Sequence, residues 1–191
     1  MMLKRLSQFM YRNYSPYLLF ALFMPVIGFF LLFNFSNFNM PISNPQLINI
    51  SGGEGLLDLE FFYTAQEAYV SLTKYGEDGR ALYKNFLAAD FIFALCYGFG
   101  FSLLFTRVLR ALDQSESRWM KFNLLPLAIA LADYIENIFI FSMLNLYPQH
   151  TQVVGTLAGI ATLSKHLLIF VSLLFLLSGT VVLLVRKIKS R

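Results

Sequence analysis

Four stretches of this chain carry almost uninterrupted apolar residues, and each is long enough to cross a bilayer. They run from about 17 to 35, from about 86 to 108, from about 122 to 146 and from about 153 to 185. A spanning helix needs about 20 predominantly apolar residues, and the last stretch could tilt or project beyond the hydrocarbon. The pattern predicts an all-α integral membrane protein, a four-transmembrane-helix bundle that forms a single membrane domain over residues 1–191.

The segment between the first two spans, residues 37–85, is more polar and predicts an extracytoplasmic cap. Prolines and glycines recur from 37 to 55, which is typical of a loop. Apolar and acidic residues then alternate from 57 to 61, which indicates a short strand with one wet face. Asp58 and Glu60 fall on that wet face. Together they could hold a cation, but acids at this spacing more often are only solvated.

A short amphipathic helix is predicted after this strand. Thr64 and Glu67 have the spacing of a capping box, and apolar residues then repeat at helical intervals until Gly76. Two roles stay open for the helix. It either covers the ends of the spans or forms a lid over an outward-opening cavity.

Composition agrees with a membrane location. Hydrophobic residues make up 57% of the chain and charged residues 14%, whereas charged residues approach about 25% in ordinary soluble domains. One cysteine and two histidines are too few for a haem, a histidine-rich di-iron centre or a usual zinc site, and no glycine-rich phosphate loop is present. We therefore predict no cofactor and no metal.

Basic residues predict the orientation. Most lie before the first span, between the second and third, and after the fourth: Lys4, Arg5, Arg12, Arg107, Arg110, Arg118, Lys121, Arg186, Lys187, Lys189 and Arg191. By the positive-inside rule both termini are cytoplasmic, and we expect a bacterial cytoplasmic (inner) membrane. The net charge of +4 indicates membrane lipids as partners. It does not indicate nucleic acid, because no basic stripe is interleaved with exposed aromatic residues.

Five ionisable residues stand inside the predicted spans: Asp90, Asp133, Glu136, Lys165 and His166. A charge at membrane depth costs roughly 2.5 to 3.5 kcal/mol on insertion scales, so such residues usually face a protein interior or a wet cavity. Asp133, Glu136 and Asn137 share one helix face. Glu136 and Lys165 lie at matching depths in their spans, about 15 Å below the outer ends. We therefore expect them to pair.

The order of these features resembles a family of small four-span prokaryotic membrane proteins. The resembling stretches are FYTAQEAY, YGEDGRALY, Asp90 with CYGFG, LLPLAIALADYIEN and TQVVGTLAGIATLSKHLL, which cover roughly residues 60–175. The resemblance implies the architecture and no particular activity. It singles out Glu67, Gly79, Arg80, Tyr83, Asp90, Asp133, Glu136, Asn137 and Lys165. His166 departs from the pattern.

The predicted ligand-binding residues combine the polar groups of the spans with these marked positions: Asp90, Asp133, Glu136, Asn137, Lys165, Arg80, Tyr83, Tyr97 and His166. One interpretation is that the charges only fix helix packing and register. The other is that they line a polar pocket that binds a small amphipathic molecule or lipid through its cationic or hydroxyl group.

Two further classes of function stay open. A membrane-embedded enzyme acting on a lipid or isoprenoid would use Asp133 or Glu136 as acid or base, with Arg80 or Lys165 near a phosphate. A structural or assembly subunit would present the small-residue faces of the second and fourth spans to a membrane partner or to a second copy in a homo-oligomer.

Overall fold

The computed structural model describes residues 2–35, 41–113 and 118–189, and the regular structure in these ranges is helical. Four of its helices are long and apolar enough to cross a membrane. They are α2 (Pro16–Asn34), α5 (Gly76–Ala111), α6 (Leu125–Leu146) and α7 (Gln152–Lys189). The four predicted segments match these helices except at two ends, because Phe35 lies just beyond α2 and residues 122–124 belong to the 3₁₀ segment η2 (Arg118–Leu124) that precedes α6. The chain has the length and composition of a polytopic membrane protein.

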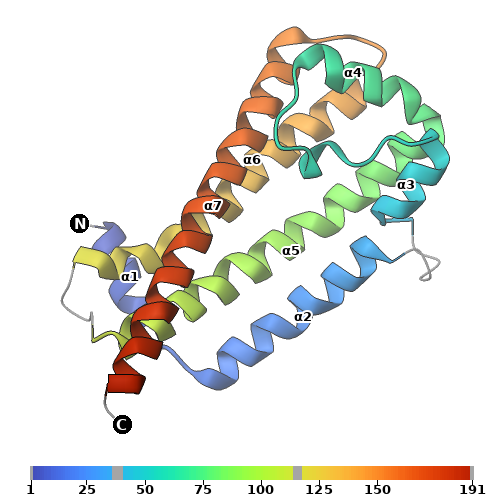
Figure 1. Ribbon diagram of the computed structural model, residues 1–191. Coiled ribbons are helices and arrows are strands. Elements are labelled where there is room, and N and C mark those ends of the chain that lie inside the picture. Colours follow the sequence, from blue (N-terminus) through green and yellow to red (C-terminus); the bar gives the residue numbers. More distant parts are fainter. Residues whose placement is uncertain (1, 36–40, 114–117, 190–191) are drawn as a thin grey trace.

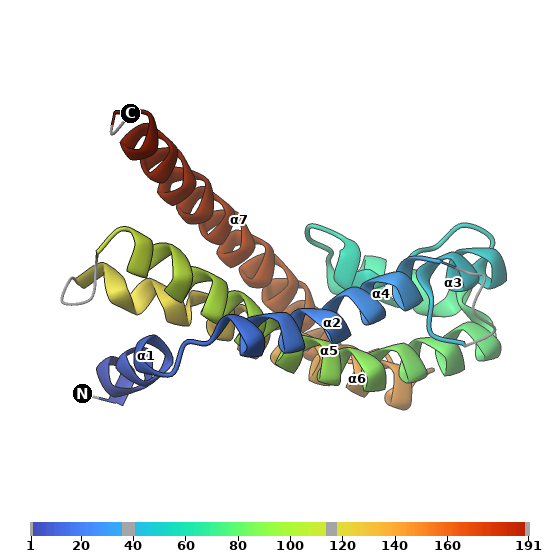
Figure 2. The ribbon, with the colours of Figure 1, turned by 90° about the horizontal axis from the view of Figure 1, so that it is seen from below.

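The four long helices alternate in direction, so both termini lie at one end of the bundle (Figure 1). α5 packs between α2 and α6, and α6 also packs along α7. Figure 2 shows that α7 runs at a clear angle to the other three. The opposite end, which we call the cap end, carries the segment between α2 and α5. Which end faces the cytoplasm stays a prediction.

The cap contains two short helices and a 3₁₀ turn: α3 (Asn44–Ser51), η1 (Leu57–Leu59) and α4 (Ala65–Lys74). The predicted loop from 37 to 55 was therefore wrong from 44 to 51, and its part from 37 to 40 lies outside the described residues. A capping box between Ser43 and Gln46 begins α3, and Gly52, at φ 73°, ends it.

The predicted strand from 57 to 61 was also wrong. Leu57 and Asp58 are both buried, whereas Leu59 and Glu60 are exposed. Two consecutive side chains therefore point inward and the next two point outward, whereas a strand would alternate them. The reason is that the chain forms a 3₁₀ turn here. The short period-two pattern had too few residues to distinguish the two geometries.

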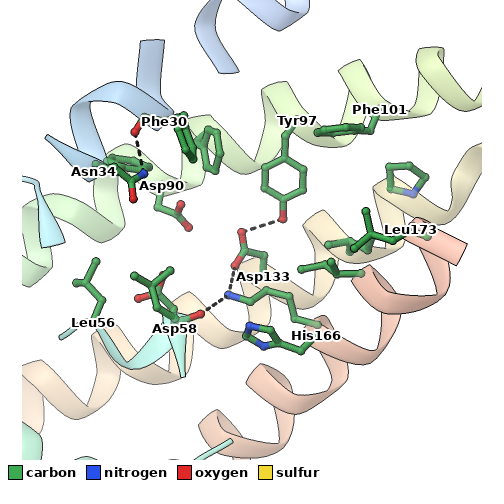
Figure 3. A pocket seen from close by; sticks show the side chains of 18 of the residues that line it. Phe30, Asn34, Leu56, Asp58, Asp90, Tyr97, Phe101, Asp133, His166 and Leu173 are labelled. Carbon is green, nitrogen blue, oxygen red and sulfur yellow. Dashed lines mark hydrogen bonds and ion pairs between the residues drawn. The ribbon is translucent and has the colours of Figure 1, made fainter. Parts of the chain in front are cut away.

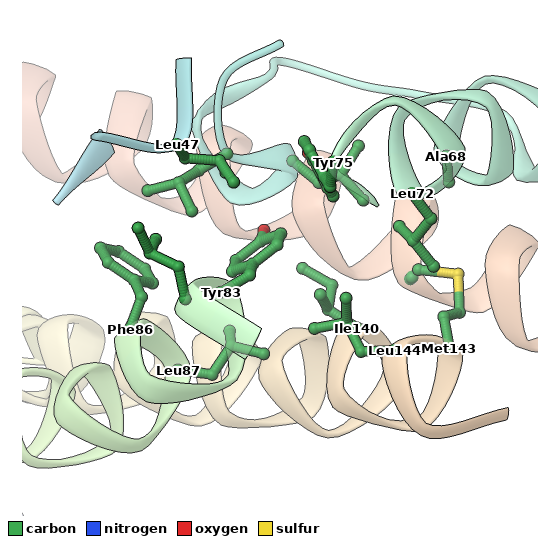
Figure 4. Packing of buried hydrophobic residues seen from close by; sticks show 14 of the residues in the cluster. Leu47, Ala68, Leu72, Tyr75, Tyr83, Phe86, Leu87, Ile140, Met143 and Leu144 are labelled. Atoms are coloured by element: carbon green, nitrogen blue, oxygen red, sulfur yellow. The ribbon is translucent and has the colours of Figure 1, made fainter. Parts of the chain in front are cut away.

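The predicted amphipathic helix is confirmed as α4. The Thr64 hydroxyl accepts the Glu67 backbone N–H at 3.3 Å, and the Glu67 carboxylate accepts the Thr64 N–H at 2.7 Å. The helix ends at Lys74, just before Gly76 bends the chain into α5 at φ 64°. Its apolar face joins a core that includes Leu72, Tyr75, Tyr83, Phe86, Ile140 and Met143 (Figure 4). This core fixes the cap to α5 and α6.

A helix that the sequence interpretation did not include, α1 (Met2–Arg12), lies across the opposite end. The Ser7 hydroxyl donates to the Met120 carbonyl oxygen at 3.0 Å, and the Asn123 amide donates to the Ser7 carbonyl oxygen at 3.1 Å. Met2, Leu6 and Phe9 remain exposed on the far side of α1. Their spacing in the sequence is helical and is the signal that predicts α1.

One ion pair at the cap surface predicts a small pH effect. The Glu54 carboxylate accepts hydrogen bonds from Lys74 at 2.5 Å and from the Ser71 hydroxyl at 2.9 Å, and these bonds hold its pKa below the ordinary value of 4.5. A lowered pKa stabilises the fold above the unfolded-state value, and that contribution is lost as the pH falls through the folded-state value.

We expect Glu54→Gln to lower the free energy of unfolding by less than about 1 kcal/mol at neutral pH, because the pair is partly exposed. The difference from the unmodified protein should shrink as the pH falls below 4.5. Unfolding titrations in detergent at neutral and acid pH measure this difference. Glu77→Gln, which changes an exposed acid on α5, is the matched control, and an equal pH response in both variants would contradict the assignment.

Candidate functional site

Lys165 of α7 is the centre of a buried polar cluster. Its ammonium group forms ion pairs with the carboxylates of Asp133, at 3.0 Å, and of Glu136, and it donates to the Asp58 carbonyl oxygen at 3.1 Å. Lys165 is 7% exposed and Glu136 is fully buried. The predicted pairing of Glu136 with Lys165 is confirmed, and Asp133 shares the same cation.

Hydroxyl groups donate hydrogen bonds to the remaining oxygen of each carboxylate. Tyr97 donates to the second oxygen of Asp133 at 2.9 Å, and Thr162 donates to Glu136 at 2.5 Å. Every carboxylate oxygen of these two acids therefore has a donor or an ion-pair partner. Such complete pairing is what makes buried charges tolerable.

Asn137 turns away from this pair toward α5. Its amide donates to one carboxyl oxygen of Asp90 at 2.7 Å. The acidic face of α6 is therefore divided between its neighbours, since Glu136 contacts α7, Asn137 contacts α5, and Asp133 contacts both. Residues at i, i+3 and i+4 spread across a helix face, so one such face can meet two helices.

Asp58 is the member of the cluster that sequence reasoning missed. The Tyr83 hydroxyl donates to its carboxylate at 2.7 Å and accepts its backbone N–H at 3.2 Å. Asp58 is 5% exposed, and burial raises the pKa of its carboxyl group. The expectation of a solvated side chain was therefore wrong. The sequence does contain a signal for burial of Asp58, because this residue stands among three leucines, Leu56, Leu57 and Leu59.

A cavity of about 430 Å³ borders this cluster, between α2, α5, α6 and α7 (Figure 3). Its polar end is lined by Asp58, Asp90, Tyr97, Asp133, Lys165 and His166. Away from that end the lining is apolar apart from Ser172 and includes Phe101, Phe105, Ile129, Ile169 and Leu176. The cavity is thus amphipathic along its length.

The cavity opens on the side of the bundle. Phe30 of α2 and Leu173 of α7 both line it, yet they are 56% and 60% exposed, and Leu59 of the cap is 58% exposed. These three residues mark a rim between α2, the cap and α7. If the four helices span a bilayer, this rim faces the lipid chains.

His166 stands at the polar end of the cavity. Its Nδ1 lies 2.9 Å from the Thr162 carbonyl oxygen. Because a carbonyl oxygen only accepts, Nδ1 carries the hydrogen, and Nε2 is free to accept when the ring is neutral. The ring also lies 5.7 Å from the ring of Phe61.

Four predicted residues lie outside the described lining of the cavity: Glu136, Asn137, Arg80 and Tyr83. Arg80 donates to the Leu72 carbonyl oxygen at 3.0 Å, and its guanidinium group lies 4.1 Å from the centre of the Tyr147 ring. It therefore ties α4 to the loop after α6. Tyr83 is fully buried and contacts two residues of the lining, Asp58 through its hydroxyl and Phe86 through its ring.

The small-residue faces are covered within the chain. A Cβ atom on Gly98 would lie 2.8 Å from the Cβ of Ala130, and one on Gly155 would lie 2.7 Å from the Cβ of Ala65. Gly159 directly faces the backbone carbonyl of Tyr63. Gly155 and Gly159, on the fourth span, therefore allow the cap segment, rather than a partner helix, to approach α7 closely.

Comparison with protein-family models, with curated proteins and with solved structures finds no match for this chain. The resemblance to a family of small four-span proteins therefore stays a prediction from the sequence. The geometry of the cluster and of the cavity carries the functional argument.

Proposed function

We propose that this protein binds a small amphipathic molecule or lipid in the cavity between α2 and α7. The observation that carries the proposal is the arrangement of the lining, with polar groups at the cap end, aromatic and aliphatic side chains along the rest, and a rim open on the flank. The volume of about 430 Å³ lies within the range of about 300 to 1,000 Å³ that is usual for ligand pockets.

The shape of the cavity fits a single chain better than a compact molecule. On α7 its lining extends from Lys165 to Leu176, which corresponds to about 16 Å along a helix axis. The aromatic side chains of α5 that line the opposite wall supply large apolar contact area. A polar headgroup at the cap end would therefore leave room for an alkyl chain beside Phe101 and Leu176.

The other two classes find less support. Asp133 and Glu136, which an acid–base mechanism would use, are both held by Lys165, and Arg80 is held at Tyr147. The small-residue faces that an assembly subunit would present to a partner are occupied by the chain itself. Binding, by contrast, needs only the cavity and its amphipathic lining.

We also infer that the cap faces away from the cytoplasm and that the membrane is the bacterial inner membrane. The support is the gathering of basic residues in the sequence around the end that carries both termini (Figure 1). A fluorescent protein that folds only in the cytoplasm, fused after Arg191, should fluoresce, and a dark but inserted fusion would reverse the orientation.

Photoaffinity labelling in bilayer discs tests the binding proposal. Two diazirine-bearing single-chain probes of equal length would be used, one with an alcohol headgroup and one with an amine headgroup. At least one should label peptides from the cavity wall, and Ile169→Trp should reduce that labelling about tenfold, because the larger ring fills the cavity beside Ser172.

Leu167→Trp is the matched control, since Leu167 is on the same helix, 51% exposed and outside the described cavity lining. It should leave the labelling of the cavity wall unchanged. Labelling confined to lipid-exposed positions, or equal in both tryptophan variants, would overturn the proposal.

A further inference from the structure

The polar cluster holds more carboxyl groups than cations. Within the described chain, the acids Asp58, Asp90, Asp133 and Glu136 gather around one ammonium group, that of Lys165. Two of these acids, Asp133 and Glu136, share that cation. The site therefore needs protons or a further cation for balance, because an unpaired carboxylate is costly to bury.

Asp90 is the acid that is free to contact a ligand. One of its carboxyl oxygens accepts the Asn137 amide at 2.7 Å, and this donor carries no charge. Asp90 is 4% exposed and lines the cavity, and its carboxyl group points toward the same space as that of Asp133 (Figure 3). The rings of Phe86 and Phe93, on the same helix, line this part of the cavity and could contact a cation through their faces.

A hydroxyl group farther along the cavity also lacks a partner. All other serine and threonine side chains of α7 donate to a carbonyl oxygen one turn earlier in the helix: Thr156, Thr162, Ser164, Ser178 and Thr180. Ser172 lines the cavity and is 7% exposed, and its hydroxyl makes no hydrogen bond within the described chain. A buried hydroxyl usually finds a partner, so this one is available to an oxygen or nitrogen of a bound molecule.

We propose that the ligand is a single-chain amphiphile with an ammonium headgroup bound at Asp90 and a polar atom in its chain that meets Ser172. This inference rests on the proposed binding function and names the chemical class of the ligand. Ser172 lies about 10 Å beyond Lys165 along α7, so the chain that leaves the headgroup passes it. An anionic headgroup is disfavoured, because Lys165 is already shared by two carboxylates and the other acids would repel it.

Competition against the photoaffinity probes tests this inference. Three competitors of equal chain length would be titrated in phosphatidylcholine discs: dodecylamine, dodecanol, and a dodecylamine that carries a hydroxyl group at mid-chain. In the unmodified protein dodecylamine should compete at least about tenfold better than dodecanol, because a charge-assisted hydrogen bond is worth about 1.4 kcal/mol or more. The hydroxylated amine should compete better still.

Three variants locate these preferences. Asp90→Asn should abolish the advantage of the amine over the alcohol, whereas Asp78→Asn, which changes an exposed acid at the start of the same helix, should keep it. Ser172→Ala should remove only the added gain of the mid-chain hydroxyl. Asn is close to isosteric with Asp, and competition by dodecanol itself reports whether the Asp90→Asn variant is folded.

The outcomes separate the two proposals. Equal competition by amine and alcohol, or an amine advantage that survives Asp90→Asn, would overturn the ammonium assignment and leave the binding function standing. A mid-chain hydroxyl gain that survives Ser172→Ala would overturn the role of Ser172. No labelling of the cavity by either probe would overturn the binding function itself.

Discussion

Replacement of Lys165 by methionine is expected to lower the free energy of unfolding by about 3 to 5 kcal/mol, the usual cost of removing one partner from a buried ion pair. Methionine keeps an unbranched side chain that is one atom shorter but removes the charge that balances Asp133 and Glu136. It also leaves the Asp58 carbonyl oxygen without its donor. The loss should be measured by denaturant titration of the protein in detergent micelles.

A double-mutant cycle distinguishes this ion-pair effect from a loss of packing. Glu136→Gln should cost less than Lys165→Met, because Asp133 still pairs with the lysine. The double variant should be more stable than Lys165→Met alone, because it removes one of the two carboxylates that were left unpaired.

Lys74→Met is the control for the loss of a lysine. Its pair with Glu54 is at the surface, with the Lys74 side chain 53% exposed, and should contribute no more than about 1 kcal/mol. If Lys165→Met cost no more than Lys74→Met, Lys165 would not be what holds the cluster together.

The pairing at Lys165 was predictable because both helices are straight apolar segments with defined ends. Counting residues from those ends gives the depth of Glu136 and Lys165, and a constant rise per residue makes that count a distance. The cost of a lone charge in an apolar layer then leaves few partners to choose from. The four spans were predicted from the length of the apolar stretches, and the capping box at Thr64 from its spacing to Glu67.

The cavity and the role of Asp58 could not be read in this way. Asp58 reaches Lys165 only because the cap segment folds back between α5 and α7, and that path depends on a 3₁₀ turn, on α3 and on the close approach at Gly159. The residue pattern of a short polar segment predicts local structure, but it does not predict these contacts with distant helices. The angle of α7 to the other long helices (Figure 2) likewise depends on tertiary packing, here of α7 against α6 and α5.

Gly159→Ala is expected to displace the cap from α7 and to cost about 3 kcal/mol, near the upper end for overpacking of a buried site. A Cβ atom at this position would overlap the carbonyl oxygen of Tyr63, which is a backbone atom and cannot rotate away. The segment that carries Asp58 would have to move with it. Thermal unfolding should show the loss, and labelling of the cavity wall by the photoaffinity probes should fall, because Asp58 lines the polar end of the cavity.

Gly28→Ala provides the control on α2. A Cβ atom on Gly28 would meet no atom within 4 Å, and alanine is favoured over glycine inside a helix by about 1 kcal/mol. This variant should therefore be as stable as the unmodified protein or more stable, with full labelling of the cavity. If Gly159→Ala behaved like Gly28→Ala, the cap would not pack on α7 at Gly159, and the position of Asp58 at the polar end of the cavity would have to depend on other contacts.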